Sequence, residues 1–206
     1  MSLLVPTYFS PISQYIAIAN TDEVLFEVED NFQKQTYRNR CYIYGPNGKQ
    51  LLNIPVKHTS TSSRKKTKDT LVDNSVSWQS QHLKSIQIAY RNSPFFEFYE
   101  DDLLPILTNK YKYLLDVSID TYLFITDALQ INQAYKKTKE YQLSTKNDYR
   151  FLANAKQEHH GNFKPYIQMF DDKFGFIKDL SVLDLLFMEG PNAISFIENN
   201  ALTLKE

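Results

Sequence analysis

Glycine and cysteine are scarce in this sequence of 206 residues, which contains five glycines and one cysteine. Neither the G-x-G-x-x-G pattern nor the P-loop pattern is present, so nucleotide binding by a glycine-rich phosphate loop is excluded. The single Cys41 excludes an intramolecular disulfide, and its position inside a strand-like run favours a packed thiol over an acyl-carrying nucleophile. We expect no cofactor.

The sequence also lacks an excess of either charge. Lys and Arg together number 23, Asp and Glu number 24, and the formal net charge is -1. A dedicated nucleic-acid binder is normally basic, so we expect no nucleic-acid partner. No stretch approaches 18 consecutive apolar residues, and we expect no integral membrane contact. The opening "MSLLVPTYFSP" lacks the charged and apolar regions of a signal peptide, which favours a cytoplasmic location.

Aromatic residues, in contrast, are abundant, with 14 Tyr and 14 Phe. Such rings can stack on sugars or bases, although a tyrosine more often lies half-buried with its hydroxyl at the surface. Their number alone therefore favours packing over ligand binding.

The first thirty residues predict a strand, a loop, a helix and a second strand. Leu3–Val5 is a short apolar run typical of a buried strand, and Ser10 before Pro11 is typical of a helix start. The helix is expected to run from Pro11 to Asn20, and Val24–Val28 has the composition of a strand. If the strands pair in parallel, the loop lies at their carboxyl edge, where the free N–H groups of the helix would favour an anion.

Two strand-like runs, Arg40–Tyr44 and Lys49–Val56, flank the turn sequence "GPNG" and predict a hairpin. Residues 59–69, "TSTSSRKKTKD", contain no apolar side chain and four positive charges. We expect a solvated loop there, with a lid over a diphosphate as the alternative.

The rest of the chain is mostly helical by its periodicity. Predicted helices cover residues 78–91, 103–114 after a cap at Asp101 or Asp102, 119–131, 182–189 and 191–199. Ser181 and Asp184 have capping-box spacing, and Lys164–Phe170 predicts a late strand. The predicted fold class is α/β, with a Rossmann-like open, mainly parallel sheet, flanking helices and a mostly helical C-terminal half. We expect one domain over residues 1–206, sheet-rich in 1–75 and helical in 76–206.

Five pieces of the sequence together resemble the WbqC-like family: "PTYFSPISQY", "DNFQKQTYRNR", "LLNIPVK", "WQSQHLKSIQIAYRNSPFF" and "LSVLDLLFMEGPNA". The resemblance implies a role in surface-polysaccharide (O-antigen) biosynthesis, with transfer of glycine onto an amino sugar as the activity proposed for the family. The chain departs from the family pattern where Val5 precedes Pro6 instead of Gln, and where Gln14 precedes Tyr15 instead of Gly.

The charged cluster "EDNFQKQTYRNR" follows the predicted central strand. Arg38 or Arg40 can clamp a phosphate or carboxylate, and Asp30 can accept a proton from a hydroxyl or an attacking amine. The alternative is a solvated loop whose charges pair with each other. His82, one helical turn after Trp78, is a candidate general base, or equally a half-buried structural histidine.

The predicted site has two classes of residues. The catalytic candidates are Asp30 and His82. The substrate-binding candidates are Tyr8, Ser10, Gln33, Lys34, Arg38, Asn39, Arg40, Lys57, Trp78 and Arg91. His58, His159 and His160 lack the spacing of a metal site, and no metal is expected.

The leading hypothesis is a transferase that acylates, with glycine as one candidate acyl group, a nucleotide-linked amino sugar. The expected partner is thus a small molecule, and a homodimer is left open. One alternative is a non-catalytic protein that binds a nucleotide sugar, a glycan or a partner through its aromatic side chains. Another is an adenylyl-transferring enzyme, because a strand, loop and helix also begin the nucleotidyltransferases. Their His-x-Gly-His motif is absent here.

Overall fold

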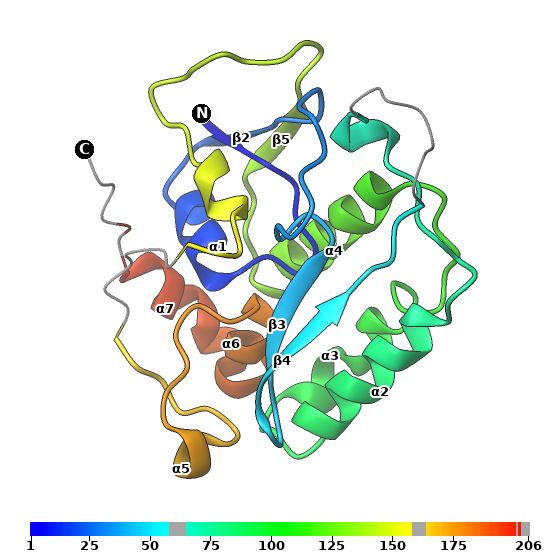
Figure 1. The fold of residues 1–206 in the computed structure, drawn as a ribbon. Coiled ribbons are helices and arrows are strands. Elements are labelled where there is room, and N and C mark those ends of the chain that lie inside the picture. Colours follow the sequence, from blue (N-terminus) through cyan, green and yellow to red (C-terminus); the bar gives the residue numbers. More distant parts are fainter. Residues whose placement is uncertain (58–64, 158–163, 201, 203–206) are drawn as a thin grey trace.

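The computed structural model describes residues 1–57, 65–157, 164–200 and 202. Within these ranges the chain is a mixed α/β fold (Figure 1). The strands are β1 (Ser2–Leu4), β2 (Glu23–Phe26), β3 (Arg40–Gly45), β4 (Gly48–Asn53) and β5 (Ala134–Lys137). The helices are α1 (Ile12–Ala19), α2 (Trp78–Tyr90), α3 (Phe96–Leu103), α4 (Leu114–Ala128), α5 (Asp171–Phe174), α6 (Val182–Glu189) and α7 (Ala193–Glu198). Short 3-10 turns are η1 (Thr67–Asp69), η2 (Arg150–Ala153) and η3 (Gly190–Asn192).

Three strands form a small parallel sheet with the order β1-β2-β5. Leu3 pairs with Leu25, and Leu25 pairs with Lys136, so the three carboxyl ends lie at one edge. The parallel unit of β1, α1 and β2 agrees with the prediction, as does the mixed α/β class. A Rossmann-like arrangement is not confirmed, because the parallel sheet of the described residues has three short strands.

The predicted hairpin is confirmed by β3 and β4, which pair antiparallel from Arg40 and Asn53 to Gly45 and Gly48. Gly48 has a φ of +95°, a conformation that glycine adopts without the steric cost of a Cβ atom. The hairpin packs against α2, beside which it runs in Figure 1.

The helices agree with the periodicity in part. The predicted helix 78–91 corresponds to α2, and 119–131 overlaps α4. The helix predicted to follow Asp101 or Asp102 is wrong, because α3 begins at Phe96 and ends at Leu103. Pro105 lacks an N–H group and cannot continue the helical hydrogen bonds, so the apolar stripe continues in turns. Its members Ile106, Leu107 and Tyr111 are still buried.

The predicted late strand is also wrong, since residues 164–170 form no strand. Gln168 is buried there, and its side chain bonds the backbone of Ile177 and the carboxylate of Asp184. Asp184 likewise does not complete a capping box, although Ser181 caps α6 by accepting from Leu183 N at 3.3 Å. Asp184 is instead buried and accepts hydrogen bonds from the hydroxyls of Tyr90 and Tyr166.

Candidate functional site

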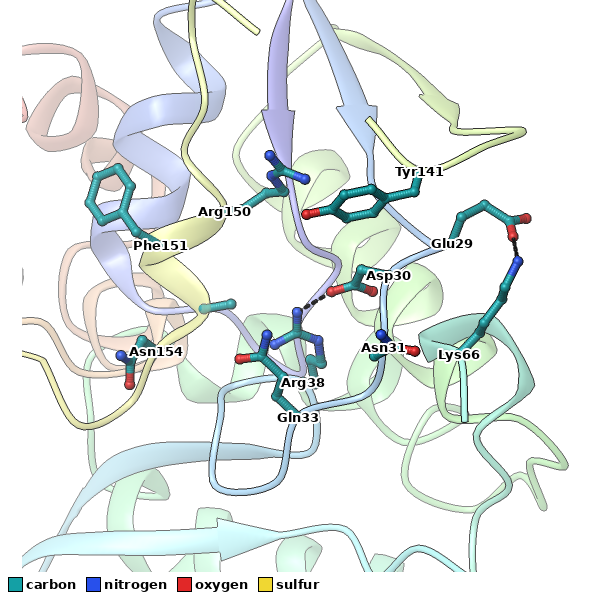
Figure 2. Close-up of a pocket in the computed structure, with 11 residues that line it drawn as sticks. Glu29, Asp30, Asn31, Gln33, Arg38, Lys66, Tyr141, Arg150, Phe151 and Asn154 are labelled. Carbon is teal, nitrogen blue, oxygen red and sulfur yellow. Dashed lines mark hydrogen bonds and ion pairs between the residues drawn. The ribbon is translucent and has the colours of Figure 1, made fainter. Parts of the chain in front are cut away.

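A pocket of about 590 Å³ lies beyond the carboxyl edge of the parallel sheet (Figure 2). Its walls come from the segments that follow β2 and β5, from the residue before η1 and from η2 and its neighbours. The lining residues are Glu29, Asp30, Asn31, Gln33, Arg38, Lys66, Tyr141, Arg150, Phe151, Ala153 and Asn154. Ligands of open α/β sheets bind outside the carboxyl ends of the strands, which is the position of this pocket.

A buried ion pair between Asp30 and Arg38 lies at the centre of the pocket. The Asp30 carboxylate also accepts from the hydroxyl of Thr67, and Arg38 Nη1 donates to Thr36 Oγ1 at 3.3 Å. These contacts fix both charged groups at the end of β2. The charged cluster predicted beyond the central strand is therefore present, and it is buried at this pair instead of solvated.

Arg38 retains one donor that the described residues leave unsatisfied. Its side chain is 4% exposed, and no described group accepts a hydrogen bond from its Nε. A buried donor without a partner costs free energy, typically about 1–3 kcal/mol. Arg38 also lines the pocket, so its guanidinium places positive charge in the pocket wall.

Glu29 forms the second charged group of the pocket wall. Its carboxylate accepts from Lys66 Nζ at 2.6 Å and from Lys68 Nζ at 2.5 Å. These two hydrogen bonds lower the pKa of Glu29, and the bond to Glu29 raises the pKa of Lys68. Two of the four basic side chains in the predicted loop therefore pair with Glu29, and one of them, Lys66, lines the pocket.

The prediction of a solvated loop is confirmed only in part for residues 65–69, because Lys66 and Asp69 are exposed whereas Thr67 is buried. Lys65 O accepts from Phe32 N at 2.8 Å, and Thr67 N donates to Asp30 O at 2.9 Å. Thr67 is buried as a result. Residues 59–64 of the loop, with Arg64, lie outside the described residues. The run of polar residues in the sequence did not predict that the backbone of residues 65–67 would form hydrogen bonds with residues 30–32.

Glu27 links the segment after β2 to the segment after β5 by hydrogen bonds. It is fully buried, and its Oε1 accepts from Thr138 Oγ1 at 2.8 Å and from Glu29 N at 2.9 Å. Its Oε2 accepts from Gln142 N at 2.8 Å. Arg150 Nη1 lies 3.8 Å from the same oxygen, which supplies the charge that a buried carboxylate requires.

The described site thus includes only some of the predicted residues. Asp30, Gln33 and Arg38 line the pocket together. The residues predicted from the sequence that lie in the interior, away from the pocket lining, are Tyr8, Ser10, Asn39, Trp78 and His82. Lys34, Lys57 and Arg91 are exposed and Arg40 is half-buried, and none of these four lines the pocket. The functional roles of all these residues stay predictions.

The start of α1 is not the anion site that the sequence predicts. Ile12 N donates to Leu180 O at 3.1 Å, and Ser13 N donates to Asp179 Oδ1 at 2.8 Å. Ser10 lies before the helix and exchanges a hydrogen bond with Thr7 Oγ1 at 2.6 Å. The expected free N–H groups are therefore occupied by a segment some 170 residues later, so a phosphate has no donors there.

His82 lies in the core between Trp78 and Tyr8. Its Nδ1 is 2.9 Å from the Tyr8 hydroxyl, and its ring centroid is 5.2 Å from that of Trp78. Burial lowers the pKa of His82 to about 4, while a hydrogen bond with the backbone of Asn53 acts in the opposite direction. Cys41 is buried too, and burial raises the pKa of its thiol. This agrees with the expectation that Cys41 packs as an apolar side chain.

Several pocket residues were missed by sequence reasoning. They are Glu29 as a wall residue, Asn31, Tyr141, Arg150, Phe151, Ala153 and Asn154. The segment 138–154 has no periodicity, and its one local signal is the spacing of Asp148 and Arg150, whose side chains pair at 2.5 Å. His58, His159 and His160 lie outside the described residues. Among the residues that are described, no three His, Cys, Asp or Glu side chains are grouped to hold a metal ion.

The comparisons with known proteins give one match. The model of the WbqC-like protein family matches residues 6–163, more than half of the chain. No curated protein and no solved structure gives a match. No helix in the described part of the chain is long and apolar enough to cross a membrane.

Proposed function

The chain belongs to the WbqC-like protein family, and from this premise we propose that it is a transferase acting on a nucleotide-linked amino sugar in surface-polysaccharide (O-antigen-type) biosynthesis. The family is associated with polysaccharide biosynthesis in general. In the proposed reaction the amino group of the sugar is acylated, with glycine as the candidate acyl group. The pocket at the carboxyl edge of the sheet is the proposed substrate site.

The observation that carries this proposal is the position of the Arg38 guanidinium, which lines the pocket beside Asp30. A guanidinium carries five N–H donors in a planar fork that is suited to phosphate, whose oxygens accept charge-assisted hydrogen bonds. Lys66 lies in the same pocket and adds positive charge. The volume of about 590 Å³ is within the roughly 300–1,000 Å³ range of small-molecule sites.

The proposed chemistry is attack of the sugar amine on the carbonyl carbon of an activated acyl donor. A C–N bond forms, the bond from that carbon to the donor's leaving group breaks, and the amine loses a proton. Asp30 is the proposed acceptor of this proton. Its carboxylate already bonds Arg38 and Thr67, and each carboxylate oxygen has a second lone pair for the amine.

The test combines an activity assay with an Arg38→Lys variant. The chain is incubated with nucleotide-linked amino sugars and activated glycine donors, and mass spectrometry is used to detect an amide product. Lysine keeps the charge beside Asp30 but lacks the Nε donor and the planar fork. We expect at least a tenfold loss of nucleotide-sugar affinity, measured by calorimetry. Lys110→Arg, on an exposed side chain that does not line the pocket, is the control for exchange of one cation for another.

Two results would contradict the proposal in different ways. Absence of an amide product across a broad panel, with nucleotide-sugar binding intact, would favour a non-catalytic binding protein. Equal affinity of wild type and Arg38→Lys would show that the pocket does not hold the phosphates. Release of pyrophosphate from ATP in place of amide formation would favour the adenylyl-transfer alternative.

A further inference from the structure

Tyr141 is a half-exposed aromatic side chain in the wall of the pocket. Its exposed fraction is 50%, and it lines the pocket together with Arg38 and Arg150. Figure 2 shows its ring extending from the segment after β5 into the space between Arg150 and Asp30. An aromatic ring that is held in a pocket without being buried offers a flat surface to a ligand.

Arg150 supports this ring from one side. Its guanidinium carbon lies 5.2 Å from the Tyr141 ring centroid, in cation–π geometry. Its Nε and Nη2 donate to Asp148, and its Nη1 donates to Gln142 O at 2.7 Å. Nη2 also donates to Leu143 O at 3.2 Å. All three nitrogens therefore bond the protein, and Arg150 fixes the segment that carries Tyr141 instead of offering its donors to a phosphate.

The pocket thus has different groups for an anionic and for a planar part of a ligand. The guanidinium of Arg38 provides positive charge for an anion, and Tyr141 offers a ring face to a planar group. A nucleoside diphosphate contains both an anionic and a planar part. A sugar phosphate contains only the first, because its ring is puckered.

We propose that Tyr141 is a specificity-determining residue that stacks on the nucleobase of the ligand, and that Arg150 is a positioning residue that holds the Tyr141 ring. This inference rests on the proposed function, since it takes the ligand to be nucleotide-linked. Stacking on an aromatic side chain tolerates all bases, so the class selected is nucleotides over simple sugar phosphates.

The test measures calorimetric affinities of the full chain for uridine diphosphate, guanosine diphosphate and glucosamine 1-phosphate. Tyr141→Leu is expected to weaken nucleoside diphosphate binding about tenfold or more and to leave glucosamine 1-phosphate binding unchanged. Tyr141→Phe, which keeps the ring, is expected to bind as wild type. Phe98→Leu is the matched control, because Phe98 is 75% exposed and outside this pocket.

Arg150→Lys tests the positioning role. It is expected to weaken nucleoside diphosphate binding, and the double variant with Tyr141→Leu is expected to show no further loss, because both changes remove the same contact. If Arg150 were merely structural, glucosamine 1-phosphate affinity would fall in parallel. Thermal unfolding of each variant confirms that it is folded.

The outcomes separate this inference from the proposed function. If the wild type binds nucleotide sugars and Tyr141→Leu binds them equally well, or loses both ligand classes equally, the stacking role is wrong and the proposed function stands. If the wild type binds no nucleotide-linked ligand, both are wrong.

Discussion

His82 shows how burial decides the chemistry of a single residue. Histidine has an ordinary pKa near 6.5 and is the common general base at neutral pH. Here the imidazole is packed against Trp78 and bonded to the Tyr8 hydroxyl, and desolvation favours its neutral form. A helical repeat predicts only that His82 and Trp78 share a face. It does not predict that this face packs against the β3–β4 hairpin and that His82 bonds the Tyr8 hydroxyl.

At the residue scale, we predict that His82→Gln reduces the pH dependence of stability. The pKa of His82 is about 4 in the folded chain and about 6.5 when unfolded. Between these values the unfolded state binds more protons, so the free energy of unfolding falls as the pH is lowered from 6.5 to 4. This loss is on the order of 3 kcal/mol. Glutamine does not titrate, and its amide oxygen can accept from Tyr8.

Urea unfolding at several pH values from 7.5 to 4.5 measures this effect. We expect the variant to be slightly less stable than wild type at pH 7.5 and to lose less stability on acidification. Parallel curves for the two chains would show that His82 binds its proton equally well in the folded and unfolded chains.

At the scale of elements, the start of α1 is built by a distant segment. The helix has eight residues and no side-chain cap of its own. Its first donors are accepted by Leu180 O and by the carboxylate of Asp179, whose φ of 53° is a conformation that Asp and Asn tolerate better than most residues. The helix itself was predictable from periodicity and Pro11, whereas its cap was not, because sequence signals for capping are local.

We therefore predict that near pH 4, where the buried carboxyl is neutral, Asp179→Ala lowers the free energy of unfolding by about 1–2 kcal/mol, because two donors of Ser13 lose their acceptor. Asp179→Asn keeps an acceptor for Ser13 N and is the matched control.

Burial raises the pKa of Asp179 to about 6, against the hydrogen bonds from Ser13 and the charges of Lys49 and Lys178, which lower it. The folded state therefore holds the proton more tightly, and stability falls as the pH rises from about 4 to 6.

Thermal unfolding between pH 4 and 7 measures both the loss of stability in Asp179→Ala and the pH dependence caused by the Asp179 carboxyl. Asp179→Asn should stay close to wild type near pH 4 and should lack the decline toward pH 6. A variant with alanine that unfolds at the wild-type temperature would show that Asp179 does not cap α1.

At the scale of the whole molecule, the pocket depends on pairings between segments far apart in sequence. The β1-α1-β2 unit and the charged cluster after β2 are local, and their positions were predicted. The strand β5 was not, because its sequence "AYKK" has little of the apolar pattern of a strand and is defined by pairing with β2. Tyr149 N also donates to Leu3 O at 2.8 Å, which brings η2 to the pocket. No local signal encodes that contact.

This convergence predicts where a bound ligand will stabilise the chain. Backbone amides of Phe32, Thr67 and Gln142 donate across three walls of the pocket, and each bond opens when those walls separate. A ligand at 100 times its Kd adds about 2.7 kcal/mol against openings that abolish binding. We expect hydrogen exchange at these amides to slow together when a nucleotide sugar binds. Amides of α7, whose residues do not line this pocket, should change only through global unfolding.

Hydrogen exchange measured by mass spectrometry, with and without ligand, distinguishes two ways in which the ligand can bind the pocket. Shared protection of all three walls means that the ligand bridges them, as a molecule held by both Arg38 and Tyr141 must. Protection confined to the amides of Phe32 and Thr67 would mean that the ligand contacts the Asp30–Arg38 pair alone, and the segment after β5 would then have no part in recognition.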